Sequence, residues 1–531
     1  MTRTAVVEAG KVSAEQGHVV ALVGGGNFAR NIAALLTYMG LSPSLCVDEF
    51  RVEDLDGIPV LRADLLDAAH VARVDRFVIA MSDPRHRDAA VARLVARGVD
   101  SERILIVADD PAIQMLRLLF ERFGERLVEA VVAAGHVDVP GLEAAFLGEQ
   151  WRSVCDGLDP LCPRLGLAYY GRGGGFRRHI MPLIPYLQDR FQLVSLSDEL
   201  AGGIGELPGR HLYMSADTAA ARTRFDLVVS AHVFPCSPPG VPRLTLPHTI
   251  HDLNFTGAYH AERLARSEPH YLFAASKPGL DAWLRLIDTQ RMRNRLCVIP
   301  GGYPHLDRNM ALAAAYAGPV DSLIYAPTLA LADYPRRELA SSLDHGVELV
   351  EGLLQRFPGY RVIFRPHPAD LKLYEVKRRD ALTGAFARLI ELCRTEPRCI
   401  LDSDPTDYMA SYNRCAAMVS DTSSTAMTFA FATGRPAFFF TPRNRELLDA
   451  LDEESAFLAQ RSDLGGVTEC IDQLLEQVAA HLAGGLGTAA GIQALRDATL
   501  FNSGTSCAYL AENIDFILTG ERHADWHYFN W

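Results

Sequence analysis

Residue types that bind phosphate occur in two short segments in the last third of the chain, each after an apolar run that predicts a buried strand. The apolar runs span 360–364 and 416–419, and the segments read Arg365-Pro366-His367-Pro368 and Asp421-Thr422-Ser423-Ser424. The second segment precedes a predicted helix, whose start presents unbonded N–H groups and the positive end of the helix dipole to an anion. Arg365 adds a planar fork for phosphate oxygens, and His367 adds a hydrogen-bond donor or proton carrier near neutral pH.

We expect both segments to act on one ligand. The carboxyl ends of parallel strands meet at one edge of a sheet, and ligands of open α/β sheets bind there. A ligand that uses two phosphate-binding loops is a nucleotide diphosphate. The alternative for either segment alone is structural, with Ser423 and Ser424 capping a helix and His367 filling a turn.

The same two segments resemble the C-terminal half of bacterial CDP-glycerol glycerophosphotransferases, which build teichoic-acid and capsule polymers. The resemblance covers 320–445 well and 160–310 more loosely, and it includes Tyr325-Ala326-Pro327-Thr328, Asp402-Ser403-Asp404 and Gly434-Arg435-Pro436-Ala437-Phe438. It implies a GT-B fold and a donor site made by Thr328, Arg365, Asp421, Thr422, Ser423 and Ser424. Thr422 stands where the family usually has an aromatic residue, and capsule sugar transferases of the same fold carry similar loops.

Two histidines are the candidates for catalysis, His248 and His367. The resemblance implies that a histidine in a short loop of the first half takes the proton of the acceptor hydroxyl, and His248 matches that position best. The Gly-Thr and the following Lys that are usual in the family are absent here. His251 is a further candidate for acceptor contact, and Asp252 could orient it. Because further ligands with recognisable spacing are missing, we expect no metal site.

A glycine-rich loop supplies further candidates for binding the acceptor or a phosphate. Gly173 and Gly174 lie after a predicted strand, Arg177 and Arg178 follow them, and a helix is predicted over 179–190. Backbone amides and cationic side chains in such a loop suit an anionic group. The alternative is a flexible loop with no ligand.

The first hundred residues form a separate α/β pattern with a glycine turn, Gly24-Gly25-Gly26, between a predicted strand and a predicted helix. Asp48 follows at about twenty residues, where dinucleotide sites place a ribose-binding acid. The pattern is similar to the N-terminal domain of bacterial sugar O-acetyltransferases, which binds a nucleotide sugar in some members. These four residues are therefore candidates for nucleotide binding. The alternative is a turn that only packs a helix on a strand.

Composition argues against several classes of protein. The 531 residues carry a net charge of −13 without a dense Lys/Arg cluster, so we expect no nucleic-acid partner. The ten cysteines include no CxxC pair, and no cofactor is indicated. No apolar run reaches the ~18 residues of a membrane span. We expect a cytoplasmic protein and leave open a peripheral contact with the inner face of the membrane.

These patterns predict an α/β protein, with a small N-terminal Rossmann-like domain followed by a GT-B pair of Rossmann-like domains. We expect the first domain at 1–110, a helical linker at 111–160, the acceptor half at 161–315 and the CDP-donor half, with a C-terminal helix and an aromatic tail, at 316–531. The predicted reaction transfers a polyol phosphate, foremost glycerol phosphate from CDP-glycerol, to a hydroxyl of a saccharide or polymer acceptor and releases CMP. The alternatives are a GT-B glycosyltransferase that uses a nucleotide sugar and a non-catalytic nucleotide-sugar-binding scaffold.

Overall fold

The chain forms two compact units, Met1–Asp156 and Gly157–Trp531, in a computed structural model. The structure describes residues 19–25, 42–49, 53–55, 57–81, 84–107, 158–159, 161–169, 176–197, 210–213, 225–231, 241–251, 269–332, 336–376, 380–404, 407–450, 455–484 and 489–531, with the single residues 29, 32, 33, 36, 154, 207 and 264. The linker predicted at 111–160 therefore lies almost wholly outside the described residues.

The first unit contains a five-stranded parallel sheet in the order β3-β2-β1-β4-β5. The strands are β1 Val20–Val23, β2 Pro43–Asp48, β3 Val60–Arg62, β4 Arg76–Ile79 and β5 Ile104–Ile106. The described helices are α3 Ala68–Arg73 and α4 Pro84–Ala96, with 3-10 turns η1 Ala63–Leu65 and η2 Ser101–Arg103. The central strand β1 is buried along its whole length, as expected for a parallel sheet covered on both faces. This topology is the Rossmann-like one that the sequence predicts.

The second unit contains two sheets, and the first has eight strands in the order β19-β12-β11-β10-β9-β6-β7-β8. All its neighbouring strands are parallel except the pair β12 and β19. The strands are β6 Arg164–Tyr169, β7 Gln192–Ser197, β8 His211–Tyr213, β9 Leu227–Ser230, β10 Arg243–Thr245, β11 His270–Ala274, β12 Leu296–Pro300 and β19 His527–Phe529. We call this sheet and its helices the first half.

The second sheet is parallel and has six strands in the order β15-β14-β13-β16-β17-β18. The strands are β13 Ser322–Tyr325, β14 Arg361–Phe364, β15 Cys399–Leu401, β16 Cys415–Ser420, β17 Ala437–Phe440 and β18 Gly465–Thr468. The strands predicted at 360–364 and 416–419 are confirmed as β14 and β16. We call this sheet and its helices the second half. Two such halves in series confirm the predicted fold class.

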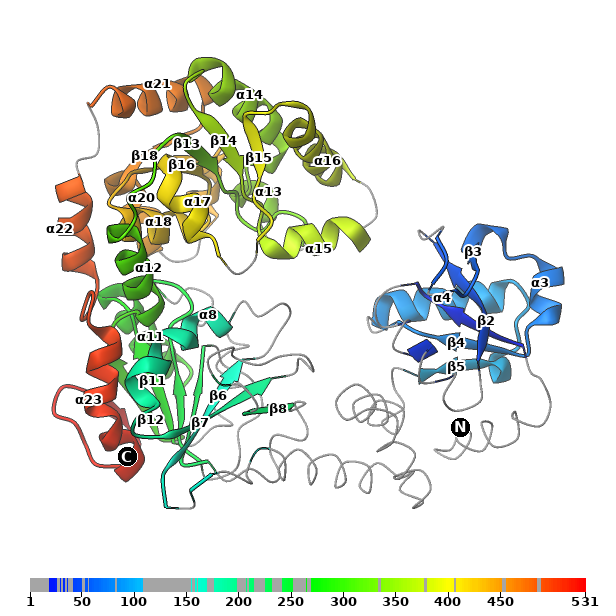
Figure 1. Cartoon of the computed structure of the whole chain (residues 1–531), viewed down its shortest axis with the longest axis horizontal. Coiled ribbons are helices and arrows are strands. Elements are labelled where there is room, and N and C mark those ends of the chain that lie inside the picture. The colour runs from blue at the N-terminus through cyan, green and yellow to red at the C-terminus, as the bar shows by residue number, and fades with distance from the viewer. Residues whose placement is uncertain are drawn as a thin grey trace. The chain divides into compact units, whose positions relative to one another are not determined.

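Helices cover the sheets of the second unit (Figure 1). They are α8 Arg177–Ile180, α9 Ile184–Leu187, α11 Lys277–Thr289, α12 Pro304–Ala314, α13 Arg337–Ala340, α14 Gly346–Arg356, α15 Pro368–Val376, α16 Ala381–Thr395, α17 Met409–Arg414, α18 Thr425–Thr433, α19 Asn444–Asp449, α20 Ala456–Leu464, α21 Ile471–Leu482, α22 Ala489–Thr499 and α23 Ser506–Thr519. The 3-10 turns η5 Met181–Leu183 and η7 Leu343–His345 accompany them. The helix predicted over 179–190 is present as a helical stretch over 177–187 that a 3-10 turn divides. Pro182 and Pro185 lack an N–H group, and the chain forms α8, η5 and α9 in succession.

Two elements connect the halves of the second unit. Helix α12 packs against α17 and α18 of the second half and against α8 of the first. The C-terminal end then returns to the first half, since α23 packs against α9 and α12, and β19 pairs with β12 as an antiparallel edge strand (Figure 1). The tail residue Trp526 is buried against Tyr271 of the first half. The last helix and strand of the chain therefore pack on the first half.

Candidate functional site at the junction of the two halves

The sheet of the second half brings the two predicted phosphate-binding segments to one edge. Strands β14 and β16 both pair in parallel with β13, so the residues after these three strands emerge side by side. Arg365 and His367 follow β14, and the Asp421 to Ser424 turn follows β16. Thr328 follows β13. This edge also meets the first half, because the Arg178 guanidinium of that half lies over the Tyr408 ring, 5.2 Å from its centre.

The Asp421 side chain forms its hydrogen bonds with groups of the protein itself. Its carboxylate is fully buried, and it accepts hydrogen bonds from the N–H groups of Thr328 at 2.8 Å, Ser342 at 2.9 Å and Thr422 at 2.7 Å. The Ser342 hydroxyl donates a fourth at 3.0 Å. Burial raises the pKa of Asp421, and the four hydrogen bonds oppose that rise. The carboxylate and the Thr328 N–H thus tie three loops together, where the sequence suggested direct contacts with a donor.

The start of α18 presents hydroxyl groups that the helix does not use. Ser424 occupies the N-cap position, yet its side chain makes no capping hydrogen bond. Ser423 and Ser424 are half-buried, whereas the Thr422 hydroxyl donates to the Ala340 carbonyl at 3.0 Å. A helix start with two such hydroxyls can bind phosphate oxygens through its first N–H groups and through the serines. The capping role that was the structural alternative is not what Ser424 does here.

Arg365 lies in a buried ion pair. One terminal nitrogen of its guanidinium donates to the Asp402 carboxylate at 2.6 Å, and the other donates to the Asp404 carbonyl at 2.8 Å. Both charged side chains are less than one-tenth exposed. The guanidinium also lies over the Tyr408 ring, 5.4 Å from its centre. Arg365 therefore holds the loop after β15, whereas the sequence suggested a direct phosphate contact.

One ring nitrogen of His367 accepts a hydrogen bond from its own turn, and the other points away from that turn. Its Nδ1 accepts a hydrogen bond from the Ala369 N–H at 3.2 Å, so the neutral ring carries its proton on Nε2. The pKa of His367 is lowered to about 4, first by desolvation among its neighbours and then by the cations Arg178 and Arg365. More than a third of the residue still reaches solvent. The neutral Nε2–H can therefore donate to a phosphate oxygen, and a bound anion would raise the pKa.

His248 lies after β10 in the first half, at the point where that half meets the second. Its ring packs 4.7 Å from Phe176 and 4.8 Å from His179, measured between ring centres. Its carbonyl accepts a hydrogen bond from the Tyr303 hydroxyl at 2.8 Å. The pKa of His248 is lowered to about 3 by burial first, then by Arg178 and by His367. The His248 ring thus packs on His179 beside Arg178, and Arg178 shares the Tyr408 ring with Arg365, two residues before His367.

His251 is held by protein groups on both sides of its ring. Nδ1 lies 2.9 Å from the Ser276 hydroxyl, and Nε2 lies 2.9 Å from Oε1 of Gln460 in the second half. Because the Gln460 amide oxygen can only accept, Nε2–H donates to it, and Nδ1 of the neutral ring accepts from the Ser276 hydroxyl. His251 thus joins the two halves, where the sequence suggested an acceptor contact.

Sequence reasoning missed four residues of this site: His179, Tyr303, His305 and Tyr408. The His179 ring lies 4.7 Å from His305 and stacks at 5.9 Å on Tyr303. His305 Nε2 forms a short hydrogen bond with the Tyr408 hydroxyl. One signal could have indicated two of them, since Tyr303 and His305 follow a glycine pair directly after β12. We call the set Arg178, His179, His248, His305, His367 and Tyr408 the junction cluster.

Comparison with known proteins supplies no family. No protein-family model matches the chain, and no curated protein matches it. Among solved structures, the wall teichoic acid polymerase TagF has a TM-score of 0.47 at 14% identity, covering 77% of this chain and 98% of that one. A UDP-N-acetylglucosamine 2-epimerase scores 0.43 at 10% identity over 68% of this chain and 98% of that one. Sucrose-phosphate synthase from Thermosynechococcus elongatus scores 0.42 at 13% identity over 68% and 100%. At such identities nothing about substrate carries over to this chain.

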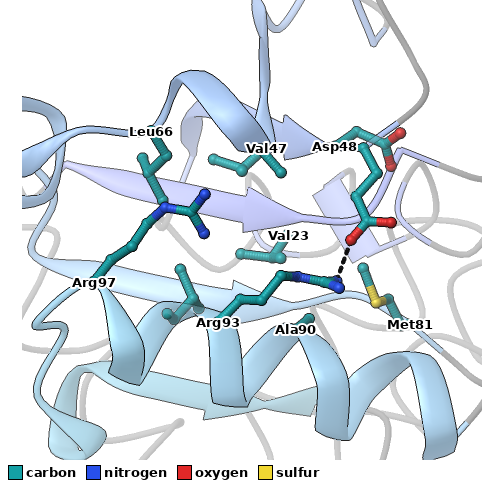
Figure 2. A pocket seen from close by; sticks show the side chains of 11 residues that line it. Val23, Val47, Asp48, Leu66, Met81, Ala90, Arg93 and Arg97 are labelled. Atoms are coloured by element: carbon teal, nitrogen blue, oxygen red, sulfur yellow. Dashed lines mark ion pairs between the residues drawn. The ribbon is translucent and has the colours of Figure 1, made fainter.

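The glycine turn of the first unit is bonded to Asp48. Gly25 N–H donates to the Asp48 carboxylate at 2.6 Å, and Gly24 has a φ of 112°, a conformation that suits glycine. Beside them is a hollow with an apolar wall, lined also by Arg93 of α4 and by Arg97, which directly follows that helix (Figure 2). Arg93 is paired with Glu49. The hollow measures about 20 Å³, room for about one water molecule.

The structure describes some of the remaining predicted residues and not others. Gly26, Gly173, Gly174 and Asp252 lie outside the described residues. Arg177 lies over the Tyr169 ring at 5.0 Å, within the first half. Within the described ranges no group of three or more His, Cys, Asp or Glu side chains is placed to hold a metal ion. No described helix is long and apolar enough to cross a membrane.

Proposed function

We propose that this protein transfers a polyol phosphate, foremost glycerol phosphate from CDP-glycerol, to a hydroxyl of a saccharide or polymer acceptor and releases CMP. The observation that supports the proposal is that the two halves meet at the Tyr408 ring, which lies under Arg178 of the first half and Arg365 of the second. His248 packs against His179, the neighbour of Arg178, and His367 lies two residues after Arg365. An acceptor base and a phosphate-binding loop from opposite halves are what a transfer between two substrates needs. The motif resemblance of 320–445 supplies the class of donor.

In the proposed reaction the acceptor hydroxyl attacks the phosphorus of the polyol phosphate. A new P–O bond forms to the acceptor oxygen, the P–O bond to CMP breaks, and the bridging oxygen leaves with its electron pair. His248 takes the proton of the attacking hydroxyl. The His367 Nε2–H and the start of α18, with Ser423 and Ser424, donate to the oxygens on which negative charge accumulates. In-line placement and charge neutralisation supply most of the catalysis in such transfers.

The low pKa of His248 applies to the protein alone. Burial and the positive charge of Arg178 keep its ring neutral there, and a neutral ring is the form that accepts a proton. A bound pyrophosphate would place negative charge beside Arg178 and raise the pKa of His248 towards the range in which a histidine is an effective base. A bound donor would therefore make His248 a stronger base.

The class of reaction is tested by the leaving group. The protein is incubated with CDP-glycerol, CDP-ribitol and a panel of nucleotide sugars, each with saccharide acceptors. Release of CMP from a CDP-polyol is the expected result. Release of a nucleoside diphosphate from a nucleotide sugar would instead indicate a glycosyltransferase, and no turnover with retained binding would indicate a scaffold. Failure of every CDP-polyol to release CMP would overturn the proposal.

The division of labour is tested by His248→Ala and His367→Ala, with donor affinity and turnover measured separately. His367→Ala should weaken donor binding and lower kcat together, because its Nε2–H acts on the donor phosphate. His248→Ala should leave donor affinity nearly intact. His527→Ala is the matched control, since this histidine is exposed on the edge strand β19. Near wild-type turnover of His248→Ala would show that His248 is a structural residue of its loop.

A further inference from the structure

Arg178 is a cation that, among the described residues, meets imidazole rings and no carboxylate. It is half-buried, its Nε donates to His179 at 3.4 Å, and no described carboxylate forms an ion pair with it. Its positive charge helps to lower the pKa values of His179, His248, His305 and His367. These rings stay neutral because of their burial, so they do not offset the charge. A partly buried guanidinium without a counter-charge is a site for an anion.

Arg178 and Arg365 have the same aromatic neighbour but differ in their ion pairing. Both guanidinium groups lie over the same Tyr408 ring, Arg178 at 5.2 Å and Arg365 at 5.4 Å from its centre. Arg365 is neutralised by Asp402, whereas Arg178 is not. The two arginines come from opposite halves, so the single ring of Tyr408 supports one cation from each half. Of these two cations, the one from the first half forms no ion pair with a described carboxylate and is available to a ligand.

Tyr408 is itself held in a fixed orientation by α12. The amide nitrogen of Asn309 donates to the Tyr408 oxygen at 2.7 Å, because an amide nitrogen can only donate. The phenol proton then points to Nε2 of His305, which accepts it. Helix α12 packs against both halves, so it fixes the ring at the junction. The face of a phenol ring attracts a guanidinium, which keeps Arg178 in place.

We infer that Arg178, supported by the Tyr408 ring, is the anion-binding cation of this site, and that Tyr408 is a positioning residue. The ligand class is a phosphate or pyrophosphate group, such as that of a nucleoside diphosphate. The inference rests on the proposed function for the identity of that group as part of a CDP-activated donor. Anion binding itself follows from the charge and contacts of Arg178.

The test measures binding without turnover. Calorimetry with CDP and, separately, with inorganic pyrophosphate is performed on the full chain and on Arg178→Gln, Arg178→Lys, Tyr408→Phe and Tyr408→Leu. Arg178→Gln should weaken both ligands by about 10- to 100-fold, the usual effect of losing a charge-assisted hydrogen bond. Arg178→Lys should recover part of that loss. Tyr408→Phe keeps the ring and should bind more tightly than Tyr408→Leu.

Two readouts separate a positioning role from a general loss of structure. Arg178→Gln should raise the pKa values of His248 and His367, followed by NMR, because a neighbouring cation is removed. The control Arg356→Gln removes an arginine from an exposed ion pair with Glu476 and should change neither binding nor these pKa values. Wild-type affinity of Arg178→Gln for both ligands would overturn the inference. If Arg178→Gln binds both ligands more weakly but the unchanged protein releases CMP from no CDP-polyol, the anion site is supported and the proposed function is refuted.

Discussion

The buried pair of Arg365 and Asp402 yields the sharpest test of how this site is built. The two side chains are 8% and 9% exposed and 2.6 Å apart. Asp402→Asn keeps the shape of the side chain and removes its charge, which leaves the Arg365 guanidinium buried without a counter-ion. Removal of one partner from a buried ion pair typically destabilises a protein by ~3–5 kcal/mol. We expect a loss near the lower end, because the Asp404 carbonyl and the Tyr408 ring still contact Arg365.

The assay is urea unfolding followed by tryptophan fluorescence, read as a shift of the midpoint at constant slope. Asp321→Asn is the matched control. It breaks the 2.9 Å pair with Arg414, whose side chains are about one-third exposed, and a pair of that kind contributes only ~0–1 kcal/mol. The double variant Arg365→Met with Asp402→Asn should lose less stability than the two single changes added together, because neither charge is then left alone.

The same variants show whether Arg365 holds the loop after β15 or contacts the donor phosphate. If it holds the loop after β15, Asp402→Asn lowers stability and does not tighten donor binding. If it were a phosphate ligand, removal of its carboxylate partner would free the guanidinium, so donor affinity would rise while stability changed little. That second pattern would refute the reasoning.

Three other predictions concern two histidines and one pair of cysteines. His248→Ala should lower kcat by ~10²–10⁴ with donor affinity retained, measured by initial rates and by calorimetry; equal losses in both would contradict a role limited to the acceptor. His251 has a pKa of about 4 in the folded chain against 6.5 in the unfolded one, so only the unfolded chain gains its proton as the pH falls from 6.5 towards 4. Stability should drop by about 1.4 kcal/mol per pH unit from this group alone, and His251→Gln should flatten the decline of the thermal midpoint between pH 7 and 5; parallel declines would contradict it. The sulfur atoms of Cys393 and Cys399 lie 3.1 Å apart, so oxidised glutathione should link them with loss of two hydrogen atoms, seen by peptide mass mapping; mixed disulfides on each cysteine would show that the pair cannot close.

The sequence by itself determined the strands, the turns at their ends and the fold class. Short apolar runs such as 360–364 and 416–419 can be buried on both faces only in a parallel sheet, and the residues after such strands must emerge at its edge. The convergence of Arg365, His367 and the serine turn on one edge follows from that local pattern. The helix predicted over 179–190 forms over 177–187 and is divided by a 3-10 turn, because Pro182 and Pro185 have no N–H group to donate to the preceding turn.

Only the tertiary structure decided which of these side chains face a ligand. Arg365 and Asp421 carry the right chemistry for a donor site, but neighbours brought from other strands satisfy them, and a sequence does not state which partner a charge will meet. His251 is similarly occupied by Gln460, more than two hundred residues away. In the described part of the chain, Arg178 bonds to the His179 ring and forms no ion pair with a carboxylate, because of where the fold places it. Long-range packing sets desolvation and pairing, and these two quantities decide whether a charged residue stabilises the protein or binds its substrate.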